Sequence, residues 1–317
     1  MLDVKVNVII YFATVIIALL LTGLFAYIAL KNSPSTLRYY RNNLLNIAFW
    51  NTALIVLIGI LVQPEFELYK SKSCARYLGP VAFLNEKAAY ACVFVGLVFT
   101  GNLICAIWLC FLTKYVQLGH PTISVWLHSK YGRLCCVLWH CLGTATSGSL
   151  GLIGVMFGEV HKANGSFLYC FELESNVPLL LGCGGIIAVM AFAFVSLVVF
   201  MVLSIQVLRS QRAVISNRTY RLQMLLIVNL LILTVLPVIF EILPIVLTCV
   251  AVYLHLPFSN VLFNVSFQLP IVEVILSWCV TLAFVQPYRK ALLKLLSRII
   301  FRKPATAHVL IVKTSIA

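Results

Sequence analysis

Two acidic residues, Glu241 and Glu273, lie inside long apolar stretches of this 317-residue chain. A carboxylate at membrane depth is costly unless it faces a cavity or a partner, so each is a candidate functional residue. Pro237 precedes Glu241 by one helical turn and Pro270 precedes Glu273, so we expect helix bends at both prolines. Either the two acids line a cavity and contact a polar or cationic ligand, or they are protonated and hydrogen-bonded to other helices.

A second polar cluster, Glu86, Lys87 and Tyr90, precedes another apolar stretch. We expect it to complete a ligand site with the two buried acids. Lys87 could pair with Glu86 or Glu241, or extend to the membrane surface. Four other polar residues within apolar stretches are expected to hydrogen-bond between helices: Asn51, Asn102, His140 and Asn229.

The composition places these residues in a membrane protein. Hydrophobic residues make up 62% of the chain and charged residues 10%, which excludes a soluble domain. Apolar runs of about 20 residues, enough to cross a bilayer, recur along the chain. They predict an all-α bundle of seven transmembrane helices with short loops and no large extra domain, at residues 6–30, 43–62, 88–112, 134–157, 179–208, 222–247 and 261–284.

The distribution of charge predicts the orientation. Of the 23 Lys and Arg residues, 17 fall on the side that holds the C-terminal tail and 6 on the other. All the acids outside the spans fall on the side that holds the N-terminus. Basic loops stay in the cytosol, so we expect the N-terminus outside and residues 289–317 as a cytosolic tail. Because the basic residues flank spans, we expect no nucleic-acid partner.

The eleven cysteines lack the paired spacing of a metal or redox site, and we expect no metal, no cofactor and no enzymatic activity. Cys74 and Cys170 are the two cysteines expected on the oxidising side, where they either form a disulfide or remain unpaired thiols. Asn164 begins an N-x-S sequon on that side, a candidate glycosylation site.

Two further patterns predict packing. Gly143, Ser147 and Gly151 recur every four residues in the fourth span, which allows close helix packing either within the bundle or in a receptor oligomer. After Pro287, basic residues alternate with leucine and isoleucine at helical spacing. This pattern predicts a short basic amphipathic helix bound to anionic membrane lipid.

Seven spans followed by a basic surface helix resemble the G-protein-coupled receptors. Asn-Ile-Ala-Phe-Trp-Asn at residues 46–51 is similar to a second-helix motif of rhodopsin-like receptors, and Pro237 resembles their sixth-helix proline. The chain departs from that group at residues 112–115, Leu-Thr-Lys-Tyr, where an acid-Arg-Tyr triplet is expected. It departs again at residues 286–289, where Gln-Pro-Tyr-Arg replaces Asn-Pro-x-x-Tyr.

The Pro-Tyr-Arg ending, the Cys-Ala-Arg-Tyr-Leu-Gly-Pro run at residues 74–80 and residues 219–223 resemble the nematode serpentine chemoreceptors of the Str superfamily, of the delta class. This resemblance implies an odorant or pheromone receptor in the plasma membrane of sensory-neuron cilia, with a small-molecule ligand and a heterotrimeric G protein as partners. The residues expected to line the G-protein cleft are Lys114, Tyr115, Arg209, Arg212, Arg218 and Arg221.

We therefore expect a ligand to enter from outside, reach the two acids and shift the sixth helix about Pro237, which opens the cytosolic cleft. The rival hypothesis is an ion-coupled carrier that uses the same carboxylates. An odd number of spans and the lack of an evident inverted repeat disfavour a carrier.

Overall fold

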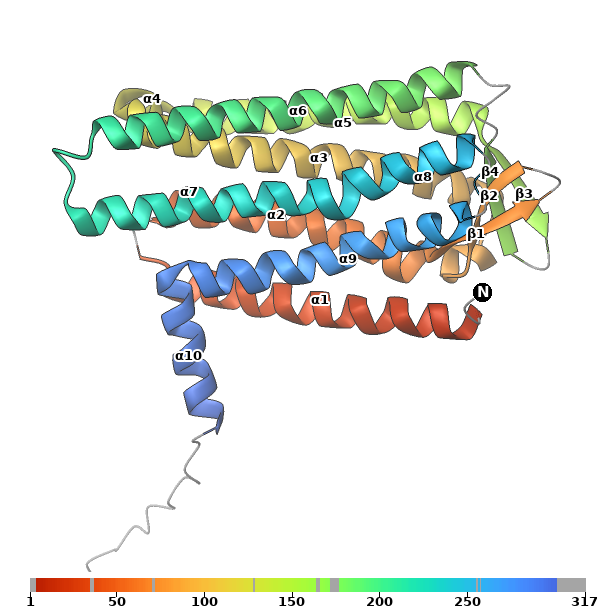
Figure 1. Cartoon of the computed structure of the whole chain (residues 1–317), viewed down its shortest axis with the longest axis horizontal. Helices are drawn as coiled ribbons and strands as arrows, with labels where there is room; N and C mark the ends of the chain where they lie inside the picture. Colours follow the sequence, from red (N-terminus) through yellow and green to blue (C-terminus); the bar gives the residue numbers. More distant parts are fainter. Residues whose placement is uncertain are drawn as a thin grey trace, which may run out of the picture.

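The computed structural model describes residues 4–34, 37–69, 72–127, 129–163, 166–171, 177–254, 256 and 258–300 of the chain. Seven helices in these ranges are long and apolar enough to cross a membrane: Lys5–Asn32, Arg38–Val62, Glu86–Gly119, Lys130–Phe157, Ile187–Ser210, Asn217–Tyr253 and Ser259–Phe284. The predicted seven-helix bundle is confirmed. It forms one elongated body with its helices roughly along the long axis (Figure 1).

Three of the long helices begin at side-chain caps that the sequence supplies. α1 covers Val4–Asn32, α2 Arg38–Val56, α3 Glu86–Gly119, α5 Lys130–Phe157, α6 Val177–Ser210, α7 Asn217–Pro237 and α9 Ser259–Phe284. Asn85 begins α3, where its side chain accepts a hydrogen bond from the backbone of Ala88 at 2.8 Å. Ser129 and Ser216 cap α5 and α7 in the same way, which satisfies backbone N–H groups that have no partner within the helix.

Two of the spans contain a π-helical segment. α2 continues into η2, Leu57–Val62, and α7 ends at Pro237 and continues through η4, Val238–Ile242, into α8, Leu243–Tyr253. Proline cannot donate the helical hydrogen bond of its position, and a π segment accommodates the resulting mismatch. By contrast, Pro270 lies within the uninterrupted helix α9.

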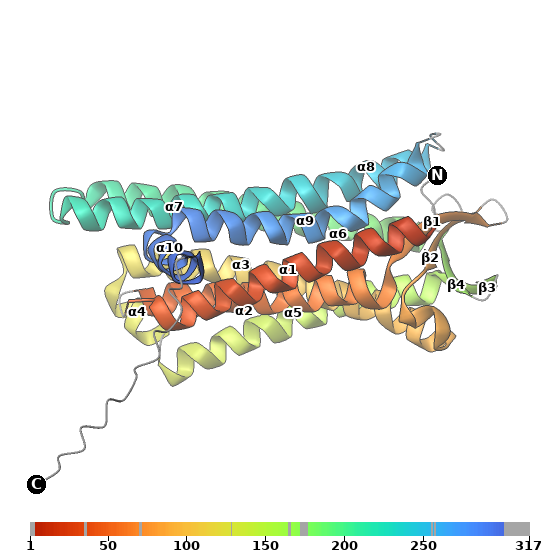
Figure 2. The same cartoon turned by 90° about the horizontal axis from the view of Figure 1, so that it is seen from below.

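A four-stranded antiparallel sheet closes one end of the bundle and was not predicted from the sequence. Its order is β1-β2-β4-β3, from β1 (Pro64–Tyr69), β2 (Lys72–Tyr77), β3 (Glu159–Ala163) and β4 (Ser166–Phe171). The short helix η3, Pro80–Phe83, follows β2. Figures 1 and 2 show the sheet beside the N-terminus, so we call this end of the bundle the sheet end.

The opposite end carries α4, Pro121–Leu127, the connection between α6 and α7, and α10, Gln286–Ile300. The last of these is the amphipathic helix that the basic pattern predicts. Figures 1 and 2 show it leaving the bundle at a steep angle to α9, and we call this end the α10 end. The two ends therefore differ in both structure and charge.

The main core lies between α1, α2, α3, α7 and α9. Trp278 of α9 is fully buried and stacks on Phe25 of α1 with ring centroids 4.2 Å apart. Tyr288 of α10 is also buried, and its hydroxyl accepts a hydrogen bond from Ser33 at 3.0 Å. These contacts anchor α10 to the α1–α9 side of the bundle.

The small-residue stripe of α5 packs against α3 within the bundle. A Cβ atom added at Gly101 of α3 would lie 2.6 Å from the Cβ of Ser147, and one added at Gly151 would lie 3.3 Å from the backbone of Phe94. The two helices can approach this closely only because these side chains are small. The stripe thus serves packing within the bundle, and a receptor oligomer has no support from it.

Candidate functional site

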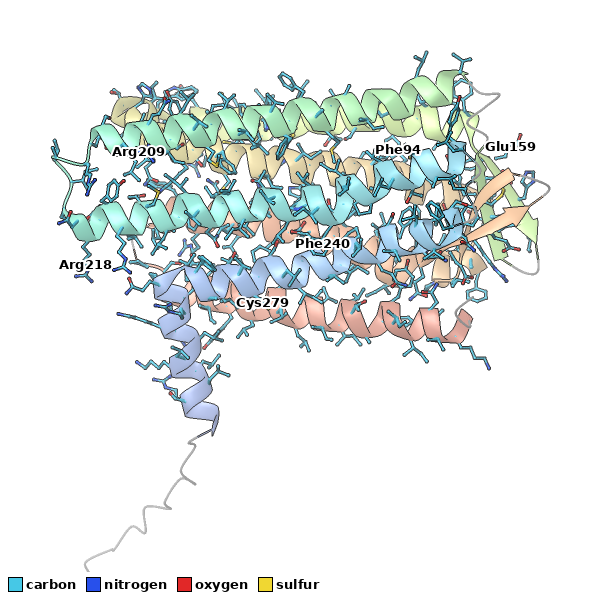
Figure 3. All side chains as sticks on the ribbon, in the orientation of Figure 1. Phe94, Glu159, Arg209, Arg218, Phe240 and Cys279 are labelled. Atoms are coloured by element: carbon cyan, nitrogen blue, oxygen red, sulfur yellow. A yellow bond between two sulfur atoms is a disulfide. The ribbon has the colours of Figure 1, made fainter. Side chains whose placement is uncertain are left out.

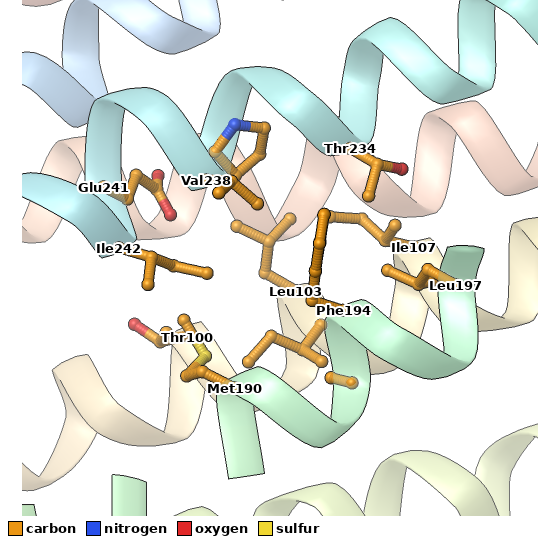
Figure 4. A pocket seen from close by; sticks show the side chains of 13 residues that line it. Thr100, Leu103, Ile107, Met190, Phe194, Leu197, Thr234, Val238, Glu241 and Ile242 are labelled. Carbon is orange, nitrogen blue, oxygen red and sulfur yellow. The ribbon is translucent and has the colours of Figure 1, made fainter. Parts of the chain in front are cut away.

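Glu241 lies in η4, at the point where the α7 helix changes its winding. Its side chain is 6% exposed and lines a cavity of about 50 Å³ between α3, α6 and η4. Figure 4 shows this side chain turned toward the cavity, whose other labelled lining residues are nearly all apolar. No described residue donates a hydrogen bond to its carboxyl group. A buried acid in such surroundings complements a ligand group that is cationic or donates hydrogen bonds.

Glu273 lies on α9, next to Glu241. It is 2% exposed, and the two carboxyl groups are close enough to interact electrostatically. Ser277 donates a hydrogen bond to its Oε1 atom. Within the described residues, its Oε2 atom has no partner. The structure therefore brings together the two intramembrane acids that the sequence singled out, and it leaves part of their hydrogen-bonding capacity unused.

Glu86, Lys87 and Tyr90 do not join this pair. Glu86 and Lys87 are exposed in the first turn of α3, at the sheet end. The Tyr90 hydroxyl donates to the Gly158 carbonyl oxygen at 3.2 Å and accepts from the Val160 N–H at 3.1 Å. Tyr90 thus holds the start of β3, and none of the three lines the cavity beside Glu241.

A polar network crosses three helices on the other side of α3. His140 of α5 is 3.0 Å from Asn46 of α2 through Nε2 and 2.9 Å from Asn102 of α3 through Nδ1. Asn102 also donates to Thr144 at 2.9 Å. The sequence predicted Asn102 and His140 as interhelical partners. The role of Asn46 was missed, because only the packing of α2 on α3 brings its side chain to the histidine.

Asn229 and Asn51, the other two polar residues expected to link helices, differ in their hydrogen bonding. Asn229 of α7 donates to Tyr40 of α2 at 2.9 Å and lies 3.4 Å from Thr281 of α9, an interhelical link of the predicted kind. Asn51 is also buried, but its side-chain oxygen has no hydrogen-bond partner among the described residues.

At the α10 end, Lys114 is buried, 3% exposed, and donates a hydrogen bond to Gln223. This bond joins α3 to α7. Tyr115, the next residue, is half-buried and packs edge-on against His120 with ring centroids 5.6 Å apart. Lys114 thus lies inside the bundle in this packing. The cleft that the sequence predicts around it opens only when the sixth helix moves, and it stays a prediction.

Four arginines at the ends of α6 and α7 and in the connection between them are all exposed: Arg209, Arg212, Arg218 and Arg221. Figure 3 shows Arg209 and Arg218 at the tips of α6 and α7. Gln211 adds a second link, donating to the Leu118 carbonyl oxygen of α3 at 2.8 Å. The α10 end therefore presents a basic surface around interhelical hydrogen bonds.

At the sheet end, a disulfide joins Cys74 of β2 to Cys170 of β4. It connects the segment before α3 to the segment before α6. The sheet is also tied to the spans, since Tyr11 of α1 donates to the Pro64 carbonyl oxygen at 3.1 Å and Asn264 of α9 accepts from the Phe66 N–H at 2.9 Å. Asn164, the predicted glycosylation site, lies outside the described residues.

Glu65 is a titratable residue at the sheet end with a shifted pKa. Burial raises the pKa of the Glu65 carboxyl above its usual value, and nearby Arg76 opposes that shift. Among the residues that the structure describes, no group of three or more His, Cys, Asp or Glu side chains is arranged to hold a metal ion.

Residues 4–298 match the family model described as the serpentine type 7TM GPCR chemoreceptor Srh. No curated protein matches the chain. The family match supports a serpentine chemoreceptor and a multi-pass membrane protein. It does not support the narrower resemblance to the delta class or the Str superfamily.

Proposed function

The chain belongs to the Srh family of serpentine seven-transmembrane chemoreceptors, and from that premise we propose that it detects a small molecule at Glu241 and Glu273 and signals to a heterotrimeric G protein. The observation that carries the ligand site is Glu241 itself, a buried carboxyl group turned toward a cavity and without a described hydrogen-bond donor. An acid in this position is costly unless a ligand or a proton compensates it.

The size of the cavity bears on how a ligand acts. About 50 Å³ holds one or two water-sized groups, so only the polar head of a ligand fits in the present packing. A ligand that places more than its polar head in this cavity requires α6 or the η4 segment to move. Binding would then favour a different packing of the bundle by the difference in its affinity for the two packings.

The η4 segment is where we propose that this movement occurs. Proline and π-helical turns are the two common sites of helix bending, and Pro237 and η4 are adjacent. A ligand contacting Glu241 acts directly on the bend. A change of angle there would move the other end of α7, which carries Gln223 and Arg221, away from α3.

We propose that the G protein binds the α10 end. The exposed arginines there provide a positive surface for an acidic partner. The hydrogen bond from Lys114 to Gln223 would hold α3 and α7 together until the movement breaks it. Lys114 then becomes accessible to the partner, so its burial fits a resting receptor.

The orientation follows from the same division of charge. We propose that the α10 end is cytosolic and the sheet end extracellular, because basic residues concentrate at the former. The disulfide at the sheet end agrees with an oxidising compartment. We also propose that α10 lies on anionic membrane lipid and that Asn164 is glycosylated.

Finer aspects of the function rest on resemblance. An odorant or pheromone ligand, the plasma membrane of a sensory cilium and placement in the Str superfamily are proposals of this kind. We do not propose membership of the delta class, because the matched family is Srh.

One experiment separates the receptor from an ion-coupled carrier. The chain is expressed in a heterologous cell and exposed to a panel of volatile amines, alcohols and acids, while G-protein activation and uptake of each compound are measured together. A receptor gives activation without uptake. Uptake without activation would assign the two acids to transport and would refute the proposed function.

A further inference from the structure

A second and larger cavity lies beside the one that Glu241 lines. It is a groove of about 770 Å³ whose lining comes from α3, α5 and α6, within the range of about 300–1,000 Å³ typical of small-molecule sites. Three of its lining residues, Phe192, Val195 and Leu142, are 76%, 60% and 55% exposed. In a membrane-spanning bundle these side chains face lipid, so the groove opens toward the bilayer.

The groove and the Glu241 cavity share a wall. Four residues line both of them: Thr100, Ile104, Met190 and Ala193. Figure 4 shows Thr100 and Met190 at the edge of the smaller cavity. The two spaces therefore adjoin at these four side chains, which lie between the bilayer side of α6 and a buried carboxyl group.

The hydroxyl groups along the groove are already hydrogen-bonded. Thr146 and Ser147 of α5 donate to backbone carbonyl oxygens of their own helix. Ser196 of α6 donates to the Ala193 carbonyl oxygen at 2.7 Å and accepts from Trp108 Nε1 at 3.2 Å. These groups need no polar ligand, and the groove suits an apolar chain. Trp139 also lines the groove, and its Nε1 atom is buried without a described hydrogen-bond partner. The carboxyl group that faces either space is that of Glu241.

We propose that the ligand is an elongated amphiphile with a protonated amine head, which enters laterally from the bilayer between α5 and α6. Its tail occupies the groove and its head lies at Glu241. The proposal rests on the proposed function for the identity of the ligand site, and it adds the ligand class and the route. Glu273 lines neither space and acts on this site through its electrostatic interaction with Glu241.

The loose packing of α6 supports this route. Within the apolar stretch of α6 that is long enough to cross the membrane, only 11% is buried, compared with 44% for the corresponding stretch of α9. Lipid tails are as apolar as the groove, so burial of a tail alone does not hold a ligand there in preference to lipid. Selectivity must come from the head group, and the complement of a buried carboxyl group is a cation.

The test measures saturable binding of radiolabelled dodecylamine to the full chain in nanodiscs of a zwitterionic phospholipid. We expect Glu241→Gln to weaken binding by about tenfold or more. Ala193→Phe fills the shared wall, and Thr146→Phe narrows the groove from α5 without touching the smaller cavity. Both should weaken binding by a similar factor. Ala191→Phe is the matched control, because Ala191 is exposed on α6 and lines neither space.

The outcomes are distinct. Wild-type affinity in both Ala193→Phe and Thr146→Phe, or an equal loss in Ala191→Phe, would overturn the lateral route. Equal competition by dodecanol or dodecanoic acid would overturn the amine head. If binding follows the expected pattern but no G protein is activated, the inference stands and the signalling proposal fails. If Glu241→Gln loses binding while Ala193→Phe and Thr146→Phe keep wild-type affinity, the ligand head binds at Glu241 but its tail does not occupy the groove.

Discussion

The hydrogen bond between Lys114 and Gln223 leads to a quantitative prediction. It links α3 to α7 at the α10 end, and the lysine that donates it is 3% exposed. We expect Gln223→Leu to raise ligand-independent signalling, because it removes the acceptor while Lys114 stays in place for the G protein.

The magnitude follows from the type of bond. A hydrogen bond to a charged group contributes about 1.5–3 kcal/mol. If only the closed packing contains this bond, its loss shifts the ratio of open to closed receptor by roughly 10- to 150-fold. For a receptor that is about 1% open at rest, the open fraction would rise to roughly 10–60%.

The assay is G-protein activation without ligand, normalised to the amount of receptor at the cell surface. Gln206→Leu is the matched control, since Gln206 is an exposed glutamine on α6. Gln223→Glu should lower basal activity, because a carboxylate is a stronger acceptor for Lys114. Basal activity of Gln223→Leu equal to that of the wild type, at equal surface expression, would refute the role of this bond.

Three further predictions concern stability. Cys74→Ser should cost about 2–4 kcal/mol and reduce surface receptor, whereas Cys279→Ser, at an exposed free cysteine, should leave surface receptor unchanged; equal surface levels would contradict a structural disulfide. Gly101→Ala should destabilise the bundle by about 1–3 kcal/mol through overpacking against α5 and so lower the thermal unfolding temperature in detergent. Gly23→Ala, which has open space around it, should raise that temperature slightly. Similar shifts in the two variants would count against the close approach of α3 and α5. His140→Ala should cost about 1–3 kcal/mol, because it removes the histidine partner of Asn46 and of the Asn102 side-chain oxygen. An unchanged unfolding temperature would show that the network does not stabilise the bundle.

The sequence was sufficient for features governed by local physics. Apolar runs of membrane length predicted the seven spans, and Pro237, singled out as a bend, lies where α7 passes into the π-helical segment η4. Glu241 and Glu273 were identified because an acid within a span is costly, an argument that requires no structure.

Features that depend on pairing between distant segments were missed. The sheet brings together strands of five or six residues from two separate loops, and each strand alone is too short for a reliable pattern. The possible disulfide between Cys74 and Cys170 was the sequence feature that indicated that these two loops lie close together. Alternation around Phe66, with Glu65 and Glu67 on either side, was a further signal for β1.

The structure separates two groups of residues that the sequence analysis placed together. Glu86 and Lys87, at the outer end of the third span, were expected to contact the ligand together with the buried acids. They lie exposed in the first turn of α3, and neither lines the cavity beside Glu241. Gln223 was noted within a family motif without a partner, because the register of α7 against α3 decides which side chain meets Lys114. The groove likewise depends on how loosely α6 packs, which hydropathy does not reveal.

The most direct test of the central claim compares ligand dose–response curves for G-protein activation in the wild type, Glu241→Gln and Glu86→Gln at equal surface expression. Glu86 is an exposed acid of α3 and serves as the control. We predict that Glu241→Gln requires about tenfold or more ligand for half-maximal activation, while Glu86→Gln matches the wild type. Superimposable curves for Glu241→Gln and the wild type would contradict a ligand site at Glu241.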